Sequence, residues 1–184
     1  NLSDVEKDPS LFELHKDIVR SFSWTAGAVS ASGWLNWISS LPISITAVLP
    51  DNSKVIAFHA SPGKDDGTGI NPKTTDEELE NILADHEFDL LFVGHTHVPF
   101  DRSYLGKRII NPGSISNQFP PDLRAGYAIM EVGAKGYDVV VYRVEYDHDS
   151  VIELTEKANH PASVYITQFM NGENLPGWEN EGDG

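Results

Sequence analysis

Cysteine is absent from all 184 residues of the chain. Disulfide bonds and thiolate metal ligands are therefore excluded, so histidine, aspartate, glutamate or asparagine would have to bind any metal ion. The sequence also lacks any apolar run near the roughly 18 residues that a membrane span requires, and we expect no membrane-spanning segment. Both absences fit a cytoplasmic protein, which is the location we expect.

Positive charge is scarce, with 13 lysines and arginines against 28 aspartates and glutamates and a formal net charge of −15. A general nucleic-acid binder carries a basic face, and this composition does not build one. Such acidity also opposes the binding of an anionic substrate, unless bound divalent cations supply the positive charge.

The composition indicates a globular protein, because 40% apolar and 22% charged residues exclude wholesale disorder. A chain of this length normally forms one sizeable core. We expect that domain over residues 1–171, followed by an acidic, mobile tail at residues 172–184.

Apolar periodicity and turn residues predict both helices and strands. A capping box at Thr74/Glu77 or Thr75/Glu78 marks one helix start, and the tryptophans at positions 24, 34 and 37 are expected on a helical core face. A strand-rich second half predicts an α/β fold with a two-sheet β-sandwich flanked by helices. The expected helices are 11–22, one near 34–38, one from 74 or 75, and 150–157; the expected strands are 43–49, 54–60, 88–93, 107–110, 127–132 and 138–144.

Histidines follow two of these strands directly. Gly94-His95-Thr96-His97 comes after the apolar strand 88–93, and His59 ends the strand before a glycine-rich loop at 61–73. Side chains two residues apart point to the same side of a strand, and neutral imidazole is a good ligand for divalent transition metals. Taken alone, the pair His95 and His97 is equally compatible with a metal site and with two unrelated surface or core histidines, and a single histidine such as His59 is more often structural. Together they predict a metal site, because strand ends converge on one edge of a layered α/β fold.

A third segment, Asn111-Pro112-Gly113-Ser114, follows the strand 107–110. Asn-Pro and Pro-Gly are common turn dipeptides, so a plain turn is one interpretation. The functional interpretation is a loop that lines the cleft with the amide of Asn111 and the hydroxyl of Ser114.

In this order, residues 59–62, 94–99 and 111–114 resemble the motifs of the calcineurin-like metallophosphoesterase superfamily, most closely its small bacterial and archaeal phosphodiesterase branch. Two further stretches look like that branch, Arg124-Ala125-Gly126-Tyr127-Ala128 and Arg143-Val144-Glu145-Tyr146-Asp147. The likeness covers roughly residues 21–155.

The resemblance implies a four-layer αββα fold and the hydrolysis of phosphomonoesters or phosphodiesters, nucleotides among them, by a metal-activated water. It implies two divalent ions, with manganese, iron, zinc and nickel as candidates. His59 and His95 would bind one ion and His97 the other. Asn111 and Ser114 would support the histidine loop and border the phosphate.

The family's Asp-x-His, Gly-Asp and Gly-Asn-His motifs supply its remaining ligands and its assisting histidine, and none of them stands ahead of His59 here. The chain therefore resembles the C-terminal part of the family, and we expect the assisting histidine upstream of residue 1 and no activity from this segment alone. We expect the loop at 61–73 to border the cleft and tune specificity. Two alternatives are a non-catalytic binding module that retains the fold and a structural-metal protein with one closed histidine site.

Overall fold

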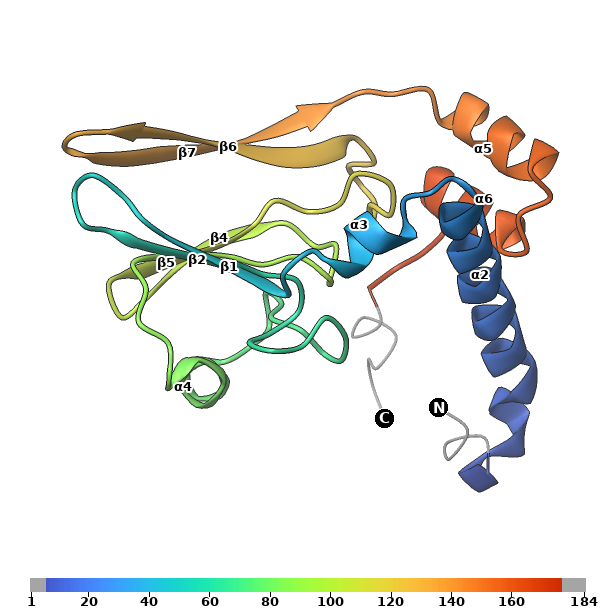
Figure 1. Ribbon diagram of the computed structural model, residues 1–184, viewed down its shortest axis with the longest axis horizontal. Coiled ribbons are helices and arrows are strands. Elements are labelled where there is room, and N and C mark those ends of the chain that lie inside the picture. The colour runs from blue at the N-terminus through green and yellow to red at the C-terminus, as the bar shows by residue number, and fades with distance from the viewer. Residues whose placement is uncertain (1–5, 177–184) are drawn as a thin grey trace. The chain divides into compact units, whose positions relative to one another are not determined.

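The computed structural model describes residues 6–176, which form two compact units (Figure 1). One unit is built from the described residues up to Leu41 together with Asp147–Asn171. The other contains Pro42–Tyr146 and residues 172–176. All the histidines proposed as metal ligands belong to this second unit.

The second unit contains a five-stranded mixed sheet in the order β1-β2-β3-β5-β4 (Figure 1). β2, β3 and β5 are parallel, while β1 and β4 pair antiparallel at the two edges. The carboxyl ends of the three parallel strands therefore lie side by side along the same border of the sheet, which runs across the strand ends. The bounds are β1 Ser44–Val48, β2 Lys54–Phe58, β3 Leu90–Phe92, β4 Phe100–Tyr104 and β5 Lys107–Asn111.

A second, two-stranded sheet lies along one face of this sheet (Figure 1). It is the antiparallel hairpin of β6 (Ala125–Gly133) and β7 (Gly136–Val144). Val139 of the hairpin is buried against Leu90 and Ile110 of the larger sheet. The two sheets thus share an apolar core.

α4 (Asp76–Leu83) covers the opposite face of the five-stranded sheet, since Leu79 and Leu83 join a core cluster with strand residues such as Ile109. The helix begins with the second of the two expected capping boxes. Thr75 accepts from the Glu78 backbone, and the Glu78 side chain accepts from the Thr75 backbone. Successive side chains along β2 and β3 point to opposite faces of the sheet. Each strand therefore contributes both to the core under α4 and to the core shared with the hairpin.

The first unit is helical, and α5 and α6 pack against each other within it. The Trp24 ring of α2 makes an edge contact with His160 at a centroid distance of 4.5 Å. No helix within residues 6–176 is both long and apolar enough to cross a membrane. The elements are η1 (Pro9–Leu11), α2 (Phe12–Ala31), α3 (Leu35–Ser39), α5 (His148–Lys157) and α6 (Ser163–Met170).

The predicted α/β class with two sheets is confirmed, with three corrections. α2 continues to Ala31, past the expected end at 22, because alanines with high helix propensity follow. β4 and α6 were not predicted from the sequence; β4 holds the polar run Asp101-Arg102-Ser103 and is a strand through its pairing with β5. The core-face prediction for the tryptophans is wrong, because α2 and α3 contain no buried residue. Trp24, Trp34 and Trp37 are 39%, 58% and 56% exposed.

Of the predicted mobile tail at 172–184, the structure describes residues 172–176, which form a turn and irregular structure. Residues 177–184 lie outside the described part of the chain.

Candidate functional site

His59 and His95 meet at the carboxyl edge of the parallel strands. His59 directly follows β2, and the Gly94 amide donates a 2.8 Å hydrogen bond to its carbonyl oxygen, which extends the strand pairing by one step. The two imidazole rings lie edge to face with their centroids 5.2 Å apart. Tertiary structure thus brings together histidines that stand 36 positions apart in the sequence.

The backbone of the His95-Thr96-His97 segment is tightly turned. His95 and His97 have φ angles of 63° and 60°, in the left-handed region that residues with a Cβ usually avoid. Between them, the Thr96 amide donates to the Gly94 carbonyl at 2.7 Å. Strained backbone of this kind persists only where surrounding contacts enforce it, and it is concentrated at functional sites.

Asn111 supplies the contacts that hold this turn. Its side chain is buried at 1% exposure, and Nδ2 donates to the Gly94 carbonyl at 2.9 Å and to the Thr96 hydroxyl at 3.1 Å. Its Oδ1 accepts from the Gly113 amide at 2.9 Å. Asn111, the last residue of β5, therefore supports the histidine turn.

The glycine-rich loop at 61–73 contacts His95 directly. His95 Nε2 lies 2.7 Å from the Gly67 carbonyl oxygen. A carbonyl can only accept, so this partner assigns the proton to Nε2 and leaves the Nδ1 lone pair free. Metal-binding histidines typically use their second nitrogen in this way.

His97 is half-buried, and it lies near enough to His95 and His59 to feel their charge. Burial lowers the pKa of His97 below its ordinary value, and the positive charges that His95 and His59 can carry lower it further. Both effects favour the neutral ring, which is the form that can coordinate a metal ion.

The donor chemistry of this cluster fits a divalent transition metal, because neutral imidazoles suit zinc, iron, nickel and copper. The number of donors is smaller than a closed site needs. Within residues 6–176, no group of three or more histidine, aspartate or glutamate side chains is arranged to hold an ion. The histidines of this chain therefore suit a metal site in which they supply only part of the ligands.

A pocket of about 270 Å³ adjoins His97. Ser114 lines it, and the Ser114 hydroxyl accepts from the Asn117 amide at 3.0 Å and from the Ser116 amide at 3.3 Å. One cation and one carboxylate, Arg143 and Asp122, face the same pocket. Its other walls are Val98, Pro99, Gly113, Gln118, Phe119, Pro120, Pro121 and Pro176.

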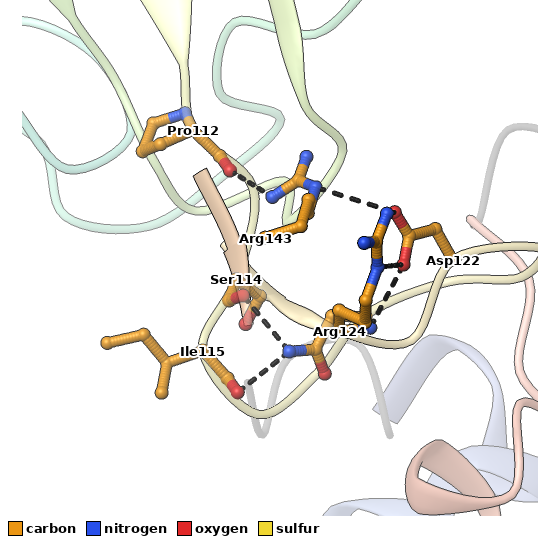
Figure 2. A network of polar contacts seen from close by, with 7 residues as sticks. Pro112, Ser114, Ile115, Asp122, Arg124 and Arg143 are labelled. Atoms are coloured by element: carbon orange, nitrogen blue, oxygen red, sulfur yellow. Dashed lines mark hydrogen bonds and ion pairs between the residues drawn. The ribbon is translucent and has the colours of Figure 1, made fainter. Parts of the chain in front are cut away.

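Arg143 was not predicted as a site residue, although the sequence contains a signal for it. The inward face of β7 carries Tyr137, Val139, Val141 and then Arg143, at every second position. An arginine on the inward face of an apolar strand is unusual and needs a partner. In the structure its guanidinium donates to the Pro112 carbonyl, as Figure 2 shows.

Comparisons with known proteins bear on the family of the chain. A family model described as the calcineurin-like phosphoesterase superfamily domain matches residues 30–135. The uncharacterized protein MJ0912 of Methanocaldococcus jannaschii is 28% identical over 155 residues, which covers 75% of this chain and 59% of that protein.

Two solved structures share the fold. The hypothetical protein PH1004 of Pyrococcus horikoshii superposes with a TM-score of 0.61 at 22% identity, covering 75% of this chain and 53% of that one. A metallophosphoesterase of Sphaerobacter thermophilus superposes with a TM-score of 0.62 at 24% identity, covering 77% and 62%. The chain thus spans between 53% and 62% of the length of these three relatives. Because the family model matches more than half of its residues, the chain belongs to the calcineurin-like phosphoesterase superfamily.

Proposed function

We propose that this chain supplies the histidine ligands of a two-metal site that hydrolyses phosphomonoesters or phosphodiesters, nucleotides among them. The observation that supports it most directly is the ring contact of His59 and His95 at the carboxyl edge of a parallel sheet. In this proposal His59 and His95 bind one divalent ion and His97 binds the other. Manganese, iron, zinc and nickel are the candidate ions.

When bound, two divalent ions about 3.5–4 Å apart lower the pKa of a water molecule and neutralise charge on the phosphoryl group. The residues of this chain orient and enclose that chemistry. The Gly67 carbonyl fixes the His95 ring, and Asn111 fixes the turn between His95 and His97. The pocket with Ser114 borders the ester beside His97.

Cations also resolve the conflict between the net charge of −15 and an anionic substrate. Three neutral imidazoles shared between two ions would hold each ion weakly, so we propose that carboxylates from outside this segment complete the site. It follows that residues 1–184 alone should be inactive, while the natural polypeptide is active.

The test measures bound metal and the hydrolysis of bis(p-nitrophenyl) phosphate with manganese, in the natural polypeptide and in residues 1–184 alone. In the natural polypeptide, His95→Ala and His97→Ala should each lower kcat/KM at least about 100-fold, as loss of a metal ligand does. The matched control is His86→Ala, because His86 precedes β3 and so lies at the opposite end of that strand from His95.

Full activity and two bound metals in residues 1–184 would overturn the shared-site proposal. Metal binding without hydrolysis by the natural polypeptide would instead identify a binding module that retains the fold.

A further inference from the structure

Arg143 joins the hairpin to the loop that follows β5. Its Nη1 donates a hydrogen bond to the Pro112 carbonyl (Figure 2). The bond is 2.7 Å long, and the Arg143 side chain is 19% exposed. Two glycines leave room for the guanidinium. A Cβ on Gly126 would lie 1.8 Å from Nη1 and 2.4 Å from the Pro112 oxygen, and a Cβ on Gly113 would lie 3.1 Å from Nη1. The backbone around Pro112 is therefore shaped to receive this arginine.

The same loop is held by a second bond from the hairpin. The Gly126 amide donates to the Ser114 carbonyl at 2.7 Å. Pro112 and Ser114 are thus both anchored, on either side of Gly113, to the strands β6 and β7. Gly126 therefore has two functions, since it supplies one anchor and makes space for the other.

The anchored loop in turn holds the histidine turn. Pro112 is bonded in sequence to Asn111, whose side chain donates to the Gly94 carbonyl and the Thr96 hydroxyl. A continuous set of contacts therefore leads from Arg143 through Pro112 and Asn111 to the strained segment between His95 and His97. Buried polar networks of this kind specify one geometry when every member is satisfied.

We propose that Arg143 is a positioning residue, which sets the orientation of the histidine turn by clamping the Pro112 carbonyl; its relevance to catalysis rests on the proposed function. Gly126 is the second half of this clamp. Together they account for the two stretches around residues 124–128 and 143–147, which the histidine site alone leaves without a role.

Asp122 orients the clamp without dominating it. Its carboxylate forms a two-pronged pair with Arg124, at 2.9 Å to Nε and 2.8 Å to Nη2, while Arg143 Nε is 3.8 Å away. Hydrogen bonding to Arg124 holds the pKa of Asp122 at about 2, with smaller contributions from the charges of Arg124 and Arg143. Asp122 is therefore ionised at pH 7, and Arg124 is its main partner.

Arg108 offers a matched control within the same unit. It also pairs with an aspartate, Asp101, and its Nη2 also reaches a carbonyl across the two sheets, that of Val139 at 3.4 Å. That carbonyl belongs to the hairpin and not to the loop after β5. Loss of Arg108 should thus weaken the sheet packing without reaching the histidine turn.

The experiment compares Arg143→Ala, Gly126→Ala and Arg108→Ala in the natural polypeptide, free of metal, by hydrogen–deuterium exchange at the Gly94 amide. This amide is protected by the His59 carbonyl, so it reports the histidine turn without requiring metal or activity. We expect faster exchange at Gly94 in the first two variants only. Cobalt affinity should fall about 10- to 100-fold in the same two variants, as for loss of an outer-shell partner.

Guanidinium ion at a few millimolar separates positioning from general stability. It should restore slow exchange to Arg143→Ala, which leaves a guanidinium-sized gap, and leave Gly126→Ala unchanged, because the new Cβ occupies that gap. The proposal would be overturned if exchange at Gly94 were unchanged in Arg143→Ala or were equally fast in Arg108→Ala. It would also be overturned if guanidinium failed to restore slow exchange to Arg143→Ala. A wild-type protein that hydrolyses no ester would contradict the proposed function alone, because exchange at Gly94 is read without substrate.

Discussion

At the scale of single residues, the candidate site depends on two histidines in backbone conformations that disfavour them. His95 and His97 both have φ near 60°, and the buried Asn111 side chain bonds the groups between them. The left-handed conformation costs a residue with a Cβ roughly 1–2 kcal/mol. The fold retains this cost at two of the histidines proposed as metal ligands.

The residue-scale prediction compares glycine with alanine at these positions. His95→Gly and His97→Gly should each be more stable than the corresponding alanine variant by about 0.5–1 kcal/mol, because glycine adopts positive φ without the Cβ penalty. Urea unfolding of the four variants measures the difference.

His59 is the control, since its φ is outside the positive region. There, alanine should be at least as stable as glycine, which loses more chain entropy on folding. The same order of stabilities at all three histidines would contradict this account of backbone strain.

At the scale of elements, the loop at 61–73 is in contact with the candidate site. Gly67 accepts from His95, and Gly69 has a φ of +64° close to the histidine turn. A Cβ on Gly69 would lie 3.0 Å from His95 Cδ2 and 3.1 Å from Thr96 Cγ2. The loop therefore abuts the ring that the proposed function requires, and we propose that it tunes which esters are accepted.

The element-scale prediction uses two glycines of this loop. Gly69→Ala should change the ratio of phosphomonoester to phosphodiester hydrolysis and weaken metal binding, because its Cβ presses on His95 and Thr96. Gly63→Ala is the matched control, with a φ of +70° and open space around its Cβ position.

Both variants should lose about 1 kcal/mol of stability from the left-handed backbone. Only Gly69→Ala should alter the site. An equal change in ester preference in both variants would show that backbone strain, and not contact with His95, tunes specificity.

At the scale of the whole molecule, a large negative charge coexists with exposed apolar surface. Every residue of the edge strand β1 is exposed, with Ile45 at 61% and Val48 at 69%. An exposed apolar strand at a sheet edge can pair with another chain. The net charge of −15 opposes such association in low salt, because like-charged molecules repel one another.

The whole-molecule prediction is that residues 1–184 alone self-associate through β1 when salt screens their charge. Ile45→Lys should reduce this association, because it places a charge on the edge strand. Sedimentation velocity at low and high salt measures the effect.

Leu105→Lys is the control, since Leu105 is 79% exposed in the turn between β4 and β5. Equal reduction by both substitutions would attribute the association to general hydrophobicity, and a monomer at high salt would contradict the prediction.

Local patterns in the sequence were sufficient for much of the fold. The capping residues of α4 and the apolar runs of β2 and β3 predict these elements because helix ends and strand periodicity are local properties. β4 was missed because its polar residues form a strand only through pairing with β5. The tryptophans of α2 and α3 were wrongly predicted to be buried. An apolar helix face indicates a need for burial, but it does not identify the surface that covers it.

The α/β class, the superfamily resemblance and the histidines at the strand ends can all be predicted from local sequence, because each depends on residues adjacent in the chain. The partners that orient these histidines are known only once the chain is folded. The bonds of His95 to Gly67, of Asn111 to Gly94 and of Arg143 to Pro112 join residues far apart in the sequence. Such contacts arise from the register of the parallel strands and the packing of the hairpin, and no local pattern contains either.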